Sequence, residues 1–331
     1  MVNSGSIATW PVGIRLFNRP DYTRKFLESL KTQTVAIDPK RTICFIDGYP
    51  KSSDYFLKVP DRTQEVADIV QEYLPEARVI RVERNVGLAK ALYTVQDEVF
   101  TLERSDWGIF LEDDLVLDDT YIEVLEHLID LAAVSDKIVK VAACQFHMGY
   151  QKLPPAPERK NFFVGQGTQA FAEKKTYFHE RSSVTASYLE ALNGSSYLHK
   201  NREQVFAALA AHGIFNFMGN NDGALDQMIG LFGKLHIVAG KQLLQDIGIQ
   251  GETSFRYPEI QIPHVQSAIP LATTADDLRS ALPDLELEFA ALQRQYFSDI
   301  WQVYRRADSV QHTVRFIAQR TLQRVKAQFV R

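Results

Sequence analysis

Three consecutive acidic residues, Glu112-Asp113-Asp114, follow an apolar stretch from Trp107 to Leu111. Adjacent carboxylates repel one another, so their proton affinity rises unless a cation or hydrogen-bond donors compensate. At the end of a buried strand they suit Mn2+ or Mg2+, because these hard ions prefer oxygen ligands and keep positions open for substrate phosphates. A metal held there would neutralise charge on a diphosphate leaving group. The alternative is a solvated acidic turn ahead of the next helix.

Four further positions stand just after apolar stretches of the chain. They are Arg19 after residues 11–17, Asp47 after residues 42–46, and Asn85 and Gly87 after residues 78–82. In open α/β sheets, ligands bind beyond the carboxyl ends of the strands. Each position alone has a simpler explanation as a turn or a helix cap. Their shared placement predicts one site that also includes the acidic residues.

The elements that must position these residues alternate between strands and helices. Strands are predicted at 11–17, 42–46, 78–82, 107–111 and 137–144, and helices at 22–33, 63–73, 85–100 and over much of 183–211. This alternation implies an α/β fold with a mostly parallel central sheet and helices on both faces. The composition changes near residue 270, so we predict a catalytic domain over 1–270 and a helical C-terminal extension over 271–331.

The overall composition excludes several classes of protein. The chain has 331 residues, of which 45% are hydrophobic and 24% charged, as in ordinary globular proteins. A net charge of -4 argues against a nucleic-acid-binding chain. Cys44 and Cys144 lie in apolar stretches and are expected to be buried and reduced, and no Cys/His spacing suggests zinc. Neither a signal peptide nor a membrane-spanning run is visible, so we expect a cytoplasmic location.

Four segments, in this order, resemble the nucleotide-binding half of the GT-A glycosyltransferases. They are ArgLeuPheAsnArgPro (15–20), PheIleAspGly (45–48), ArgAsnValGlyLeuAla (84–89) and IlePheLeuGluAspAspLeu (109–115). The chain is most similar to the group of N-acetylglucosaminyltransferase I and to bacterial family 2-like enzymes. This resemblance implies a Rossmann-like GT-A domain, with a nucleotide-sugar half at about 10–130 and an acceptor half at about 131–270. It also implies inverting transfer of a sugar from a nucleotide-diphosphate donor, most often a UDP-sugar, to a glycan or glycolipid.

The same resemblance implies roles for individual residues. In the family the last acid of the triplet binds the metal ion, which makes Asp114 the ligand of Mn2+ or Mg2+. The middle acid approaches the ribose and the first approaches the donor sugar, which correspond to Asp113 and Glu112. The other nucleotide-sugar contacts fall on Arg19, Asp47, Asn85 and Gly87.

An inverting transfer also needs a carboxylate that accepts the proton of the acceptor hydroxyl. The segment 217–227 offers Asp222 and Asp226, which lie on one face if this stretch is helical. Relatives carry an aspartate at a helix start here, often after a tryptophan, whereas this chain reads Asn-Asn-Asp. Asp222 is therefore the first candidate for the general base and Asp226 the second. A helix cap and a surface charge are the alternative.

The stretch 243–256 resembles the glycine-containing loop that folds over the donor in this family. Gly248 and Gly251 would supply backbone freedom and close approach to the ligand. Ser254 and Arg256 are expected at the diphosphate. An ordinary surface loop is the alternative.

The C-terminal residues 313–331 form a basic amphipathic pattern. Such a helix can pack on the catalytic domain, or it can lie on an anionic membrane at the inner face, which would suit a lipid-linked glycan acceptor. Two other functions are compatible with parts of this sequence. A nucleotidyltransferase is disfavoured because no Gly-rich loop follows the first strand, and a noncatalytic sugar- or nucleotide-binding protein stays open. The sequence indicates neither the donor sugar, nor the acceptor, nor the oligomeric state.

Overall fold

The computed structural model describes residues 6–49, 60–102, 105–143, 162–165, 169–193, 200–215, 221–239, 243–248 and 273–306. Within these residues the centre of the molecule is an eight-stranded sheet with the strand order β3-β2-β1-β4-β8-β6-β9-β7. Its strands are β1 Val12–Leu16, β2 Thr42–Ile46, β3 Arg78–Arg81, β4 Trp107–Glu112, β6 Ile138–Ala142, β7 Phe162–Val164, β8 Phe171–Lys174 and β9 Leu235–Ala239.

Most neighbouring strands of this sheet are parallel. Strand β1 pairs in parallel with β2 and β4, β2 with β3, and β6 with β9. Strand β8 is antiparallel to both of its neighbours, β4 and β6, and β7 is antiparallel to β9. The predicted mixed α/β fold with a mainly parallel sheet is therefore confirmed, and the two antiparallel strands are an addition to it.

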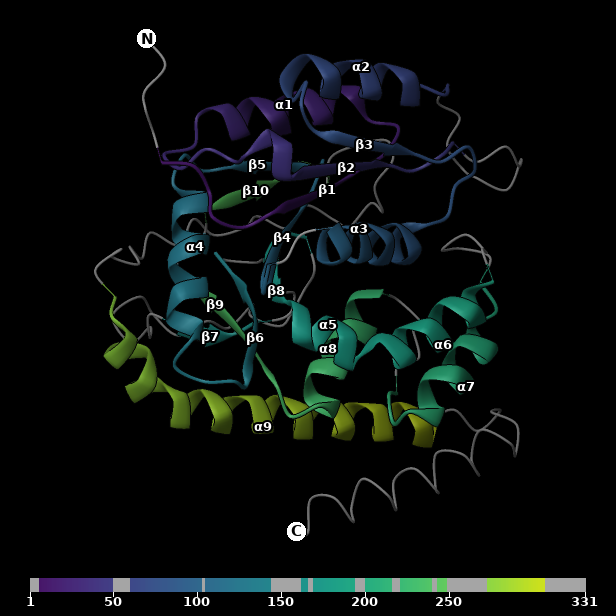
Figure 1. Cartoon of the computed structure of the whole chain (residues 1–331). Coiled ribbons are helices and arrows are strands. Elements are labelled where there is room, and N and C mark those ends of the chain that lie inside the picture. Colours follow the sequence, from purple (N-terminus) through teal and green to yellow (C-terminus); the bar gives the residue numbers. More distant parts are fainter. Residues whose placement is uncertain are drawn as a thin grey trace.

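Helices cover both faces of the sheet, as the alternation in the sequence predicts. They are α1 Pro20–Lys31, α2 Thr63–Tyr73, α3 Leu88–Leu102, α4 Tyr121–Ala132, α5 Lys175–Glu180, α6 Ser182–Leu192, α7 Arg202–Ala211 and α8 Asn221–Leu231. Figure 1 shows α1 and α2 over one face of β1–β3 and α3 on the opposite face. Most strands are buried along most of their length, so both faces of the sheet carry apolar side chains. Helices must cover both faces to remove these side chains from water.

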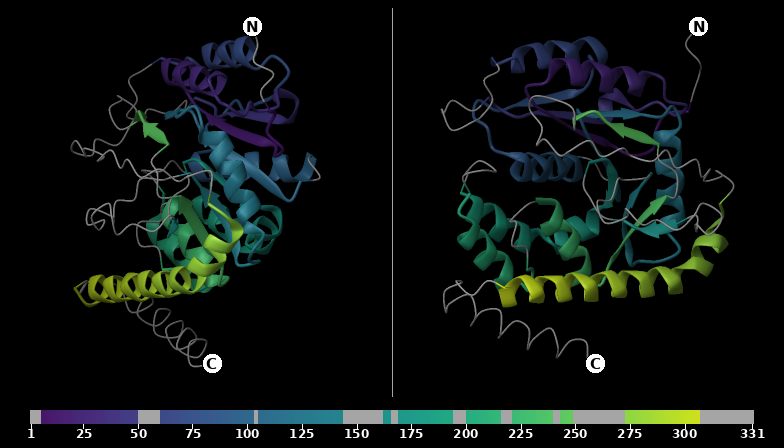
Figure 2. Two further views of the ribbon diagram at one scale, coloured as in Figure 1. Left: turned by 90° about the vertical axis from the view of Figure 1, so that its left-hand side faces the viewer. Right: turned by 180° about the vertical axis from the view of Figure 1, so that it is seen from behind.

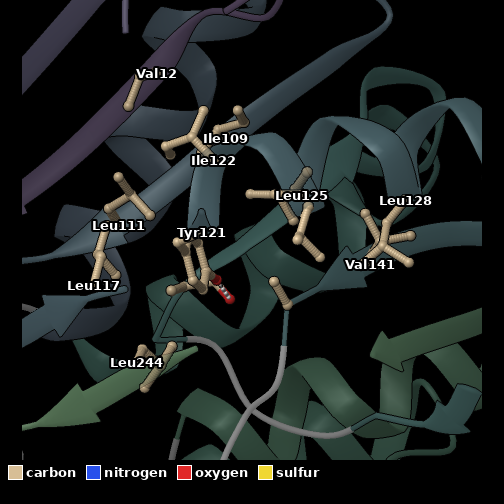
Figure 3. Packing of buried hydrophobic residues seen from close by; sticks show 14 of the residues in the cluster. Val12, Ile109, Leu111, Leu117, Tyr121, Ile122, Leu125, Leu128, Val141 and Leu244 are labelled. Carbon is tan, nitrogen blue, oxygen red and sulfur yellow. Dashed lines mark hydrogen bonds between the residues drawn. The ribbon is translucent and has the colours of Figure 1, made fainter. Parts of the chain in front are cut away.

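Alternation along the strands divides the hydrophobic core in two. Val12, Ile14 and Leu16 of β1 join the core cluster that includes residues of α1 and α4, whereas Ile43 and Phe45 of β2 join the cluster that includes residues of α3. Successive side chains of a strand point to opposite faces, which produces this division. Figure 3 shows the first cluster, where residues of β1, β4, β5, α4, β6 and β10 meet.

A second, two-stranded sheet lies beside the first. It consists of β5 (Leu115–Leu117) and β10 (Leu244–Asp246), which are antiparallel with Asp246 opposite Leu115. The backbone amide of Ile247 continues the pairing by donating to the carbonyl of Asp114 at 2.8 Å. This pairing brings the start of the stretch 243–256 against the acidic residues.

A long helix, α9 (Ala275–Arg306), runs along the end of the molecule away from α1 and α2 (Figure 2). Leu278 and Leu285 of this helix are buried in the same core cluster as β1. The helix begins close to the predicted change at residue 270, and the amphipathic stretch 313–331 lies outside the described residues. No helix among the residues described is long and apolar enough to span a bilayer.

The one described cysteine agrees with the sequence prediction. Cys44 is buried in β2 and carries a free thiol, and burial raises the pKa of this thiol to about 12. It is therefore a small core residue and not a reactive nucleophile. Cys144 lies outside the described residues.

Candidate active site

The polar residues of interest gather at the carboxyl ends of β1 and β4. These two strands are neighbours, while the chain leaves β1 through α1 to reach β2 on its other side. The strand order therefore reverses between β1 and β4, and ligands of open α/β sheets bind at such a point. Strand β1 leads into Asn18 and Arg19, and β4 leads into the three acids.

Arg19 forms ion pairs with two of the three acids. Its Nη1 lies 2.8 Å from Oδ2 of Asp114, and its Nη2 donates to Oδ1 of Asp113. Asp113 is only 1% exposed and also accepts a hydrogen bond from the backbone amide of Phe17 at 3.1 Å. Burial raises the pKa of Asp113, and the positive charge of Arg19 offsets part of this rise. The acidic triplet is therefore partly neutralised by the protein itself.

A second arginine, Arg15, was not identified from the sequence. Arg15 is the register partner of Glu112 across β1 and β4, and its Nη2 donates to Oε1 of Glu112. Its Nη1 donates to the carbonyl of Leu88 at 3.1 Å, at the start of α3. The available signal was one basic residue inside the apolar stretch ValGlyIleArgLeu. The contact itself depends on strand register, which sequence periodicity does not determine.

Asp47 holds the turn that precedes α3. Its two carboxylate oxygens accept four hydrogen bonds, from the backbone amides of Gly48, Val86 and Gly87 and from Nδ2 of Asn85, at 2.8–3.1 Å. Gly87 has a φ of +81°, a conformation that glycine adopts without steric cost. Burial raises the pKa of Asp47 to about 6. The structure thus brings together the predicted residues Asp47, Asn85 and Gly87, with Asp47 as the acceptor at the centre.

Asp114 differs from Asp47 because it keeps an unused acceptor. Its Oδ1 is buried and has no hydrogen-bond partner in the part of the chain that the structure describes. Gly248 lies so close that a Cβ atom at this position would be 2.5 Å from Oδ2 of Asp114. Among the described residues, no group of three or more His, Cys, Asp or Glu side chains could hold a metal ion. The unpartnered Oδ1 of Asp114 fits a divalent ion that takes one protein carboxylate and completes its shell with water and substrate phosphates.

The two candidate bases lie on α8. Asp222 is the second residue of this helix and Asp226 lies one turn further on, so the part of the segment 217–227 that the structure describes is helical. A short turn joins the end of α8 to the amino end of β9, so Asp222 lies at the far end of the helix from that edge of the sheet.

Asp226 acts electrostatically on the buried Tyr177 of α5. Burial raises the pKa of Tyr177 well above its usual value, and Asp226 is among the carboxylates that add to this rise. Helix α5 begins beside the amino end of β4, where the amide of Lys175 donates to the carbonyl of Asp106. Asp226 is therefore nearer to the edge of the sheet opposite the acidic triplet.

Three predicted residues, Gly251, Ser254 and Arg256, lie outside the described residues. The described part of the same stretch ends at Gly248, which is against Asp114.

Comparison with known proteins gives one family match. The family model for glycosyl transferase family 2 matches residues 12–186, more than half of the 331-residue chain. No curated protein matches the sequence. Among solved structures, the chain is similar to TarS of S. aureus, with 11% identity and a TM-score of 0.34, over 52% of this chain and 29% of TarS. The match thus spans less than a third of TarS, while the family model includes β1, β4 and the residues between them.

Proposed function

The chain belongs to glycosyl transferase family 2, and from this premise we propose that it transfers a sugar from a nucleotide-diphosphate donor to a glycan or glycolipid acceptor in a metal-dependent, inverting reaction. A UDP-sugar is the expected donor, with Mn2+ or Mg2+ as the ion. Family membership supports glycosyl transfer over nucleotidyl transfer, the other enzyme class weighed from the sequence.

One observation carries this proposal. Arg19 and the three acids converge where the strand order reverses, and one buried oxygen of Asp114 is left without a hydrogen-bond partner among the described residues. A buried acceptor without a donor is costly, so such an atom calls for a ligand. A divalent ion between Asp114 and a diphosphate would meet this need.

The residues present divide the chemistry between them. A bound divalent ion would stabilise the negative charge on the departing diphosphate. Arg19 would bind phosphate oxygens through its planar guanidinium, which suits them geometrically. Asp47 holds the side chain of Asn85 and the backbone of Gly87, where the base and ribose would lie. Glu112, held by Arg15, would contact the hydroxyl groups of the donor sugar.

We assign the general base to Asp222. The acceptor oxygen would attack the anomeric carbon, the bond from that carbon to the β-phosphate oxygen would break, and the hydroxyl proton would pass to the carboxylate of Asp222. The direction of α8 supports this choice over Asp226, which acts electrostatically on the buried Tyr177. Replacing Asp222 by Asn should lower kcat by about 10²–10⁴-fold, the usual contribution of a general base. The matched variant Asp226→Asn should retain kcat, and a larger loss in that variant would reverse the assignment.

A donor screen tests the proposed function directly. Thermal shifts with UDP-, GDP-, TDP- and CMP-sugars and Mn2+ should identify one nucleotide class, because a ligand that binds the folded state raises its stability. Hydrolysis of that donor should require Mn2+ or Mg2+ and be lost in Asp114→Asn. The control Asp119→Asn removes an exposed carboxylate five positions away and should retain activity. Absence of any shift and of any donor hydrolysis in the unmodified protein would contradict the proposal.

A membrane-associated acceptor is the final part of the proposal. It rests on the basic amphipathic pattern of residues 313–331, which lie outside the described residues. Such a helix binds anionic lipid through its apolar face and its positive charges. Co-sedimentation with anionic liposomes should be lost when residues 310–331 are removed. Equal binding by the full and truncated chains would rule out this contact.

A further inference from the structure

Arg19 lies beside Asp114, the residue that would bind a metal ion. It stands between β1 and α1, and its two terminal nitrogens are used by Asp113 and Asp114. The side chain is 17% exposed, compared with 1% for Asp113 and 14% for Asp114. Arg19 is thus the protein's own counter-ion for both acids, and it retains access to solvent.

The arginine is not fully satisfied in this position. Its Nε is buried and has no hydrogen-bond partner among the residues that the structure describes, and the same holds for Oδ1 of Asp114. A guanidinium has five donors in a fixed fork, which match the oxygens of a phosphate better than the edges of two separate carboxylates. A diphosphate would therefore offer Arg19 a better partner than it has now.

A divalent ion on Asp114 would lie beside this guanidinium. Oδ1, the free oxygen, belongs to the same carboxylate whose Oδ2 is 2.8 Å from Nη1 of Arg19. Two cations so close repel each other strongly where solvent screening is weak. The ion alone should therefore bind weakly, and a diphosphate that draws Arg19 away should strengthen its binding.

We propose that Arg19 is an exchangeable counter-ion that neutralises Asp113 and Asp114 in the free protein and moves to the diphosphate when the donor binds. Metal binding at Asp114 then depends on the nucleotide through this one side chain. The inference rests on the proposed function, since it assumes that the ligands are a divalent ion and a nucleoside diphosphate. It adds to that function the residue through which nucleotide binding changes the affinity for the metal ion.

The test measures Mn2+ binding by electron paramagnetic resonance, with and without UDP, and needs no turnover. In Arg19→Gln, Mn2+ alone should bind about tenfold more tightly than in the unmodified protein, within the usual range of coupling between sites. The enhancement by UDP, taken as the ratio of the two affinities, should fall by a similar factor. Arg19→Lys keeps the positive charge, so its affinity for Mn2+ alone should stay nearly as low as that of the unmodified protein.

The control is Arg24→Gln, which removes an arginine of α1, the helix that follows Arg19; Arg24 pairs with Glu72 at the surface. It should bind Mn2+ as the unmodified protein does. Equal Mn2+ affinity of Arg19→Gln and the unmodified protein without UDP would overturn the inference and leave the proposed function in place. Tight Mn2+ binding by the unmodified protein without UDP would overturn it without any variant, even if Arg19→Gln fails to fold. Absence of both Mn2+ and nucleotide binding would overturn the proposed function as well.

Discussion

Two clusters in this molecule contain buried arginines paired with carboxylates. They differ in the number of carboxylates for each arginine. In the interior, Arg181 pairs with Glu173 at 2.6 Å and also donates hydrogen bonds to the neutral side chains of Gln96 and Thr185. These residues join β8, α3 and α6, and Arg181 and Glu173 are 1% and 3% exposed. The guanidinium of Arg181 lies over the rings of Tyr177 and Phe178. Its ion pair joins one cation to one carboxylate, and the buried Lys140 is the register partner of Glu173 across β6 and β8.

The cluster at the ends of β1 and β4 is not balanced. Two arginines, Arg15 and Arg19, face four carboxylates, which are the acidic triplet and Asp47. Among the residues that the structure describes, the carboxylates of this cluster outnumber its arginines by two. Incomplete hydrogen bonding does not separate the two clusters, because Nε of Arg181 also lacks a hydrogen-bond partner among the described residues. The difference teaches that an excess of carboxylates over arginines is what sets the cluster at the strand ends apart.

The largest expected effect comes from breaking the interior cluster. In Glu173→Gln, Arg181 stays buried without a carboxylate, so the free energy of unfolding should fall by about 3–5 kcal/mol. Binding of nucleotide with Mn2+ by the folded protein should not change, because this cluster does not contact the acidic triplet. Urea denaturation and nucleotide titration would measure the two quantities. The control Glu180→Gln removes a more exposed pair with Lys234 and should cost less than about 1 kcal/mol.

The converse variant at the strand ends should show the opposite pattern. Asp114→Asn removes one surplus charge, so stability should change little, whereas donor hydrolysis should fall by about 10²–10³-fold, as when a preorganised electrostatic contact is lost. If Asp114→Asn destabilises the protein as much as Glu173→Gln does, both clusters are structural. The contrast between them would then be wrong.

A smaller effect is expected where the backbone approaches Asp114. In Gly248→Ala, the added Cβ would lie 2.5 Å from Oδ2 of Asp114, so the carboxylate must shift. We expect the affinity for nucleotide with Mn2+ to fall about tenfold, equivalent to about 1.4 kcal/mol. Gly233→Ala is the control, because it meets no atom within 4 Å and carries only the cost of a φ of +62°. Unchanged affinity in Gly248→Ala would mean that the carboxylate can shift without consequence.

The sequence predicts the strands and helices better than it predicts the contacts between them. Thr42–Ile46 and Thr63–Tyr73 match their predicted ranges, because each is an apolar pattern bounded by polar or turn residues. The convergence of Arg19, Asp47 and the acidic triplet also follows from parallel strand order. The ion pair of Arg15 with Glu112 could not be predicted, since it depends on register between β1 and β4. The pairing of β5 with β10 joins segments more than a hundred residues apart, which local periodicity cannot indicate.

The last prediction concerns the pH dependence of stability at Asp47, the carboxylate whose oxygens accept four hydrogen bonds from its own protein. Its pKa is raised by burial to about 6 from an ordinary value of 3.8, so between these pH values the folded protein holds a proton that the unfolded chain has lost. The stability that this group contributes is therefore fully present below about pH 4 and is lost as the pH rises through about 6. The slope is at most about 1.4 kcal/mol per pH unit.

Asp47→Asn should remove this slope, because an amide does not titrate. The variant's absolute stability will also change, because Nδ2 of the new asparagine would face one of the donors that now bind Asp47. The pH dependence is therefore the quantity to compare. Measured by urea denaturation between pH 4 and pH 7, the stability of Asp47→Asn relative to the unmodified protein should rise up to about pH 6 and then level off. Parallel curves would show that Asp47 titrates normally. The carboxylate that binds the Asn85–Gly87 turn would then be more accessible to water than the structure shows. Asp47 and Asp114 would then differ less in how completely the protein satisfies their oxygens.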